Sequence, residues 1–307
     1  MKPAIILITG ITGFIGSHVA EHLIKSKYRV IGLRRKKSDL WRCKNFEHKV
    51  EWVIINDRLK ATIIELKPDI IIHCAWEGIT ANHRNDIHIQ RSNKMLLNDL
   101  LNIAAVCKTE KFIALGSQAE YGFLNKAVSE KEKVKPDTAY GKIKVECCNR
   151  VERFCGTHNL NWYWLRLFAF YGPRESTDWF IPHIIKSLID KKEKIELGAG
   201  TQKYAYLYIG DLVKYILLLV KKSNTKNGVY NISGSNAYLL KNMALKIKAN
   251  FKTTATKLEF GVLPARANQS LMLKGKMNKF HQQIGKPPLT TIDKGLKQTI
   301  KYYKSQA

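Results

Sequence analysis

Ala4-Ile5-Ile6-Leu7-Ile8-Thr9-Gly10-Ile11-Thr12-Gly13-Phe14-Ile15-Gly16 is the stretch that decides the fold of this chain. Its apolar part, residues 4–9, is too short for a helix and ends at a glycine, which predicts a buried strand. The three glycines lead into a helical pattern that continues to Lys25. Glycines let the backbone turn tightly and let a diphosphate approach bare amide groups at a positively polarised helix N-terminus. The stretch therefore predicts a strand–turn–helix unit that binds a diphosphate, with a tight turn without a ligand as the alternative.

The residues after the second predicted strand carry positive charge. That strand covers residues 29–33, and Arg34, Arg35 and Lys36 follow where a NAD-binding fold usually has an acidic residue. An acid there would repel a ribose 2′-phosphate, whereas an arginine would bind it. We therefore expect NADPH (NADP) as the preferred cofactor, with NAD possible, and a solvated basic loop is the alternative. The contacts expected from these two segments are Gly10, Thr12, Gly13, Phe14, Ile15, Gly16, Arg34 and Arg35.

Strand and helix patterns alternate through the first half of the chain. Further strands are expected at residues 51–55, 69–73, 111–115 and 161–167, with a helix at about 87–107 and another around Tyr140. This alternation predicts an α/β fold with a doubly wound parallel sheet, a Rossmann fold, whose ligands lie at the carboxyl ends of the strands. Beyond Gly172 the pattern loosens. We expect a dinucleotide-binding domain over 1–172 and a smaller substrate-binding lobe over 173–307, with a segment near 204–222 returning to the first domain.

Tyr140 and Lys144 point to acid–base chemistry. Residues four apart lie on one face of a helix, so the Lys144 ammonium is expected near the Tyr140 hydroxyl. A neighbouring cation would lower the tyrosine pKa from its usual value of about 10. Ser117 adds a hydroxyl that could bond the same substrate oxygen. We therefore take Ser117, Tyr140 and Lys144 as the catalytic residues, although this spacing alone often reflects surface packing.

Composition limits the remaining possibilities. The chain has 307 residues, 45% of them hydrophobic, and its apolar runs are far too short to span a membrane. Glycines interrupt the first apolar run, so no signal peptide is expected. Six cysteines show no metal-binding spacing, which favours reduced thiols, a cytoplasmic location and no metal site. The net charge of +27 favours anionic partners. Because the lysines are scattered, an anionic small substrate is preferred to nucleic acid.

Further short motifs follow the glycine-rich stretch along the chain, and together with it they match the pattern of one family. They are Asp57, His73-x-Ala75, Asn93, the trio Ser117, Tyr140 and Lys144, Arg166, Tyr171-Gly172-Pro173, Gly200-x-Gln202, Asp211, Tyr230-Asn231-Ile232 and Arg266. Almost end to end, the chain resembles the extended short-chain dehydrogenases/reductases of the NAD-dependent epimerase/dehydratase type, which act on nucleotide sugars. The resemblance implies a homodimer formed by the Tyr140 helix and the helix near 93–105. Residues on these helices that exceed one core face are Leu96, Leu97, Leu100, Leu101 and Val145.

The resemblance also implies the rest of the site. The further cofactor contacts would be Asp57 and Arg58 near the adenine, with Ala75, Asn93 and Lys144. The implied substrate contacts are Trp76, Gln118, Ala119, Glu120, Arg174, Lys203 and Arg266, of which Arg266 would bind the diphosphate. The chain departs from the family pattern at Leu96 and Leu97, which replace Gly-Thr, at Ala169, which replaces an asparagine, and at Tyr204, which replaces an arginine. Lys203 is the candidate to compensate for Tyr204.

Other departures narrow the reaction. Gln118 and Ala119 stand where sugar 4,6-dehydratases resemble one another in an Asp-Glu pair, and neither side chain shuttles protons. Ala119 and Trp179 stand where fucose-forming epimerase-reductases have cysteine and histidine. We therefore expect NADPH-dependent reduction of a 4-keto-6-deoxy nucleotide sugar at carbon 4, in deoxysugar biosynthesis for surface polysaccharide. A 4-epimerase with retained NAD is the alternative, and a non-catalytic basic nucleic-acid-binding protein is a remote one. The sugar and the nucleotide stay open, with a dTDP- or CDP-linked substrate expected.

Overall fold

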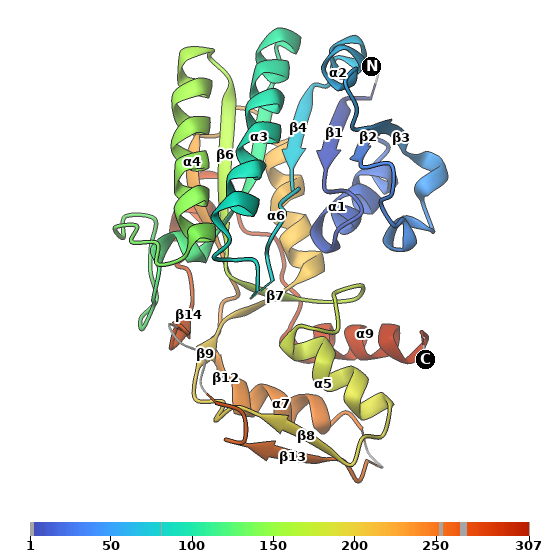
Figure 1. Cartoon of the computed structure of the whole chain (residues 1–307), viewed down its shortest axis with the longest axis vertical. Coiled ribbons are helices and arrows are strands. Elements are labelled where there is room, and N and C mark those ends of the chain that lie inside the picture. Colours follow the sequence, from blue (N-terminus) through green and yellow to red (C-terminus); the bar gives the residue numbers. More distant parts are fainter. Residues whose placement is uncertain (1–2, 81, 252–253, 265–268, 307) are drawn as a thin grey trace.

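The computed structural model describes residues 3–80, 82–251, 254–264 and 269–306. Figure 1 shows a sheet with helices on both faces in the upper part of the molecule and a smaller lobe below it. In the described part of the chain no helix is long and apolar enough to cross a membrane.

The large sheet has seven strands, and every pairing in it is parallel. In spatial order they are β11 (Gly228–Ile232), β6 (Asn161–Leu167), β5 (Lys111–Ser117), β4 (Ile70–His73), β1 (Ile5–Thr9), β2 (Arg29–Arg34) and β3 (Glu51–Ile54). The direction of winding changes between β1 and β4. In open sheets of this kind ligands bind at that switch point, beyond the carboxyl ends of the strands. The predicted doubly wound Rossmann sheet is confirmed.

Successive residues of β1 belong to two different cores. Ile6 and Ile8 face one core, with the buried sides of α1 (Phe14–Lys25) and α6 (Ile209–Lys221). Leu7 faces the other, with α2 (Leu59–Leu66), α3 (Ile87–Cys107) and α4 (Ala139–Thr157). Because helices cover both faces, the strand is apolar throughout instead of alternating with polar residues. The short helix α8 (Asn278–Gln283) packs beside β11 through Phe280.

The lobe has a third core of its own. It lies between α5 (Phe180–Ile189), α7 (Leu240–Lys248) and α9 (Ile292–Lys304). The small sheets pair β7 (Ala169–Tyr171) with β10 (Tyr206–Tyr208), β8 (Lys194–Leu197) with β13 (Lys257–Phe260), and β9 (Lys203–Tyr204) with β12 (Tyr238–Leu239) and β14 (Met272–Leu273). Single-turn 3-10 helices lie at η1 (Trp41–Cys43), η2 (Glu47–Lys49) and η3 (Gln118–Tyr121).

The chain crosses between the sheet and the lobe more than once. After β10, helix α6 packs on the sheet and β11 adds its edge strand, before β12 and α7 return to the lobe. No observation tests the predicted boundary at 172/173, and the division stays a prediction.

Candidate active site

The glycine-rich turn after β1 is closed by backbone packing. Gly10 has φ +65°, and a Cβ there would lie 2.6 Å from the Ala75 amide nitrogen. A Cβ on Gly16 would lie 2.2 Å from the Gly10 carbonyl oxygen. Gly13 is the N-cap of α1 and carries no side chain to bond the first amides of the helix. The turn therefore fits a diphosphate group, which needs bare amides at a helix N-terminus.

A groove of about 800 Å³ opens beside this turn. Arg35 contributes a side chain that is 74% exposed, with only a long 3.5 Å contact to Glu77. Arg34 is held differently: its guanidinium lies over the Trp52 ring and donates to the Lys36 carbonyl. With four basic side chains and one acidic one, the lining of the groove next to the turn is positively charged. Its lining residues are Thr12, Gly13, Arg35, Lys36, Lys37, Ser38, Asp39 and Arg42.

The loop after β4 is tied to the glycine turn and to α3. The Ala75 amide donates to Thr9 Oγ1, which also bonds His73 Nδ1 at 2.8 Å. Asn93 on α3 accepts the Glu77 amide at 2.7 Å and donates back to the Glu77 carbonyl. Asn93 was expected to contact the cofactor. Its amide instead holds this loop in place.

Ser117 and Tyr140 meet at the carboxyl end of β5. Ser117 is buried and caps η3, and its hydroxyl lies close enough to Tyr140 to act against the rise of the Tyr140 pKa. Thr138 is the N-cap of α4, so Tyr140 lies in the first turn of this helix. A Cβ on Gly141 would lie 2.4 Å from the Ala119 carbonyl oxygen, so glycine permits close packing of α4 on η3. The structure thus brings the predicted Ser117 and Tyr140 together.

Lys144 is fully enclosed and serves other partners than expected. Its ammonium donates to the Leu115 carbonyl at 2.6 Å and lies 3.4 Å from the centre of the Trp76 ring. Burial lowers the pKa of Lys144 to about 7. Its ammonium lies 5.8 Å from the centre of the Tyr140 ring, and its role in lowering the Tyr140 pKa stays a prediction. Burial raises the pKa of Tyr140, and the opposing contributions come from Ser117 and from Arg84.

Glu120 lies buried beneath the site and bonds to the residues that line it. Its carboxylate accepts from the Ser117 amide and from Trp164 Nε1, both at 2.8 Å, and from Arg166 Nε at 2.6 Å. The side chain is completely buried, and both oxygens are used within the protein. Glu120 was expected to contact substrate. The structure instead shows the carboxylate neutralising Arg166 and fixing Ser117, and a substrate contact stays a prediction.

Comparison with known proteins agrees with this geometry. Residues 6–233 match the model of the NAD dependent epimerase/dehydratase family. The chain belongs to this family. It is an enzyme of the extended short-chain dehydrogenase/reductase type, as its motifs indicated.

Individual relatives span most of the chain. CDP-abequose synthase of Salmonella muenchen is 26% identical over 302 residues, 96% of each sequence. An uncharacterized UDP-glucose epimerase of Bacillus subtilis is 29% identical over 258 residues, 78% of this chain and 80% of the relative. The crystal structure of UDP-glucuronic acid 4-epimerase from Bacillus cereus, in complex with UDP-glucuronic acid and NAD, is 25% identical. It matches with a TM-score of 0.83 over 99% of this chain and 100% of its own.

Arg174 is a clamp in this epimerase/dehydratase-family protein. Its guanidinium donates to the Arg42 carbonyl at 2.8 Å, to Glu21 at 2.7 Å and to His18 Nδ1 at 2.8 Å. His18 Nε2 donates in turn to the Pro173 carbonyl. Arg174 was expected to contact substrate. The structure uses its nitrogens to fasten the turn after β7 to α1.

The other predicted contacts are spread around the cleft. Trp76 and Gln118 are half-buried beside the Ser117–Tyr140 pair, and Ala119 is buried. The rest lie further out: Lys203 is exposed on β9, Asp57 and Arg58 are exposed after β3, and Arg266 lies outside the described residues. Asp57 and Arg58 do not line the basic groove. All of these roles stay predictions.

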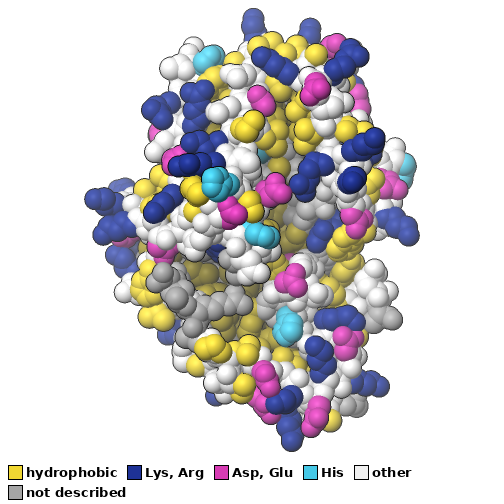
Figure 2. Space-filling view, viewed as in Figure 1, with side chains coloured by type: hydrophobic (Ala, Val, Ile, Leu, Met, Phe, Trp, Pro, Cys, Tyr) yellow, Lys and Arg dark blue, Asp and Glu magenta, His cyan; other side chains and the backbone are white. Residues whose placement is uncertain are grey.

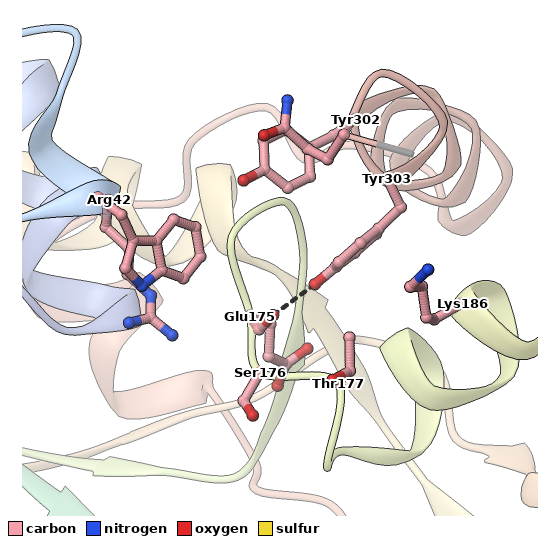
Figure 3. Close-up of a pocket in the computed structure, with 9 residues that line it drawn as sticks. Arg42, Glu175, Ser176, Thr177, Lys186, Tyr302 and Tyr303 are labelled. Carbon is pink, nitrogen blue, oxygen red and sulfur yellow. Dashed lines mark hydrogen bonds between the residues drawn. The ribbon is translucent and has the colours of Figure 1, made fainter.

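A second hollow, of about 430 Å³, lies between η1, the loop after β7, α5 and α9 (Figure 3). Tyr303 donates to the Glu175 backbone carbonyl across it. Burial raises the pKa of the Glu175 carboxyl well above its usual range. The nearby cation Lys186 is paired with Asp190 at 2.5 Å. No motif or spacing signalled Glu175 or this hollow, since its residues meet only through folding.

Proposed function

We propose that the protein is an NADPH-dependent 4-ketoreductase of a nucleotide-linked 4-keto-6-deoxy sugar. The observation that carries the proposal is the side-chain set after β5. Ser117 and Tyr140 lie next to each other and provide a proton-transfer pair, while half-buried Gln118 and buried Ala119 stand where water elimination would need acids. This set supports a redox step at a carbon–oxygen bond and gives no support to a dehydration.

A bound NADPH would supply the hydride that adds to carbon 4 of the keto sugar. Ser117 would donate a hydrogen bond to the carbonyl oxygen and keep it beside Tyr140. As the carbon–hydrogen bond forms and the carbonyl π bond breaks, Tyr140 would give its proton to the oxygen and leave an alcohol. The phenolate would then regain a proton from solvent. Arg35 and the neighbouring lysines support the choice of NADPH, because they line the groove with positive charge.

The nucleotide is proposed to be a pyrimidine, CDP or dTDP. Similarity to CDP-abequose synthase along 96% of both chains supports a CDP-linked deoxysugar. We place the reaction in deoxysugar biosynthesis for surface polysaccharide, in the cytoplasm. The second candidate is a 4-epimerase with retained NAD, favoured by the epimerases among the relatives.

The test is NADPH oxidation by the purified protein with CDP- and dTDP-linked 4-keto-6-deoxyhexoses. Reduction to the alcohol with one of them supports the proposal, and the same assay with NADH tests the cofactor preference. Interconversion of two sugar nucleotides without added cofactor would establish the epimerase instead. Salt-dependent nucleic-acid binding by a Tyr140→Phe variant that keeps full biological function would point to the remote alternative.

A homodimer through α3 and α4 is also proposed, on a smaller surface than the sequence suggested. Leu97, Leu100 and Leu101 lie in the core, at 0–1% exposure. The exposed apolar residues on α3 are Met95, at 72% exposure, and Val106, at 58%, and Leu96 and Val145 are half-buried. The positive charge is dispersed on the face in Figure 2 and does not mark one partner surface. A monomeric mass at micromolar concentration would refute the dimer.

A further inference from the structure

Arg84, which no motif singled out, lies directly on Tyr140. Its guanidinium carbon is 4.7 Å from the centre of the tyrosine ring. Arg84 belongs to the loop between β4 and α3, far from α4 in sequence. A cation over an aromatic face is attracted by the ring, and more strongly where water is excluded.

The backbone holds Arg84 in this position. The Tyr140 amide donates to the Arg84 carbonyl at 2.9 Å, and the Ala139 amide donates to Asn85 Oδ1 at 3.3 Å. The loop is braced from below by Gln90, whose amide donates to the Gly78 and His83 carbonyls. The first turn of α4 and the loop therefore form one unit.

One atom of Arg84 is left without a partner. Its Nε is shielded from solvent and makes no hydrogen bond to the described residues. A buried guanidinium donor without an acceptor destabilises a fold unless another interaction compensates. The position over Tyr140 offers such an interaction through the ring face, and the interaction strengthens when the tyrosine oxygen carries negative charge.

Two other charged side chains, Glu120 and Lys144, lie near Tyr140. Glu120, on η3, disfavours a negative phenolate. Lys144, on the same helix as Tyr140, points its ammonium at the Leu115 carbonyl and the Trp76 ring and lies 5.8 Å from the Tyr140 ring centre. Trp76 meets Tyr140 edge-on at 5.9 Å. Among the cations around the Tyr140 ring in the described residues, Arg84 is therefore nearer to the ring centre than Lys144.

We propose that Arg84 is a positioning residue that fixes the Tyr140 ring and, in addition to Lys144, stabilises its anionic form during proton transfer. Its catalytic meaning rests on the proposed reductase function, but its effect on Tyr140 does not. Substitution of Arg84 should therefore move the ionisation of Tyr140 with no substrate present.

The experiment places 3-fluorotyrosine at position 140 and follows its ¹⁹F resonance against pH in the full-length protein. We compare Arg84→Gln, Arg84→Lys and the control Arg91→Gln, which removes an exposed arginine of α3. Arg84→Gln should raise the titration midpoint by about one pH unit, a tenfold change in the ionisation constant. Arg84→Lys should restore most of the difference, and Arg91→Gln should leave the midpoint in place. Equal melting temperatures of the variants would show that the fold is intact.

Activity provides the second readout. If the protein reduces a keto sugar, Arg84→Gln should lower kcat, leave KM nearly unchanged and move the alkaline limb of the pH profile upward with the ¹⁹F midpoint. An unchanged or lower midpoint in Arg84→Gln, or an equal shift in Arg91→Gln, would overturn the proposal. If no keto sugar is reduced but the midpoint shifts as expected, the proposed function fails while the assignment of Arg84 stands.

Discussion

The groove beside the glycine turn is lined by exposed basic side chains, whereas the cluster around Tyr140 rests on buried ones. Arg35 is 74% exposed in the groove, while Glu120 beneath Ser117 is completely inaccessible. In the groove, the fold contributes the backbone amides of the glycine turn, and the exposed side chains only set the local charge. On the catalytic side, Glu120, Arg166 and Lys144 are part of the core. We therefore expect substitutions in the groove to change ligand affinity alone, and substitutions under Tyr140 to change stability as well.

Removing the Tyr140 hydroxyl should give the largest effect on activity. Tyr140→Phe deletes the proposed proton donor, and positioned acids contribute about 10²–10⁴-fold to rate. We expect kcat to fall by this factor while NADPH binding, measured by calorimetry, is unchanged. A matched control is Tyr28→Phe, a half-buried tyrosine of the opposite face of the sheet. Turnover above a tenth of the original rate would show that another group donates the proton.

Breaking the buried ion pair should give the largest effect on stability. Glu120→Ala leaves Arg166 buried without its partner at 2.6 Å, which typically costs about 3–5 kcal/mol of unfolding free energy. The control is Glu146→Ala, which breaks the exposed pair with Lys94 and should cost about 1 kcal/mol or less. Both free energies would be measured from denaturant unfolding curves. Similar losses of unfolding free energy in the two variants would show that the buried ion pair matters no more than the exposed one.

Charge in the groove should affect cofactor choice more modestly. Arg35→Ala should weaken NADPH binding about tenfold, roughly 1.4 kcal/mol, and leave NADH binding unchanged, because only the 2′-phosphate is lost as a partner. Arg34→Ala is the comparison, since the structure engages Arg34 with Trp52 and Lys36. A larger loss of NADPH affinity in Arg34→Ala than in Arg35→Ala would assign the phosphate contact to Arg34 instead. Equal affinities of the original protein for both cofactors would refute a 2′-phosphate site.

The smallest effect on the free energy of unfolding at neutral pH should come from substitution of His18 or His73. Burial lowers the pKa of each to about 3, aided by Arg174 for His18 and by Lys144 for His73. Both stay neutral in the fold, while the unfolded chain binds protons below about pH 6.5. The stability they contribute is therefore complete above pH 6.5 and is lost as pH falls toward 3. His18→Gln should flatten this acid dependence in urea unfolding. His48→Gln, at an exposed histidine, should leave it as it was.

Sequence patterns located the strands and helices of the sheet closely. The expected strand at 161–167 and the helix at 87–107 match β6 and α3. The glycine turn was also found from its spacing. These features succeed because buried parallel strands, glycine turns and helical spacing leave local signatures.

The roles of charged residues were harder to predict. Glu120 and Arg174 stood next to the motifs and were expected to contact substrate, yet both bond within the protein. Asn93 holds a loop, and Lys144 points to the Leu115 carbonyl. Adjacency in sequence shows where a residue is, but the choice among partners depends on which polar groups become buried together.

The amino-acid sequence alone determined the sheet and the turn that fits a diphosphate. Each depends on residues close together or on periodicities that one strand or helix expresses by itself. Only the tertiary structure decided that Ser117 lies beside Tyr140 and that Arg84 is nearer to the tyrosine ring than Lys144. Arg84 and Tyr140 are joined by a contact between a loop and a distant helix. Such a contact has no spacing rule, because it arises when two separately specified elements are packed together and water is excluded between them.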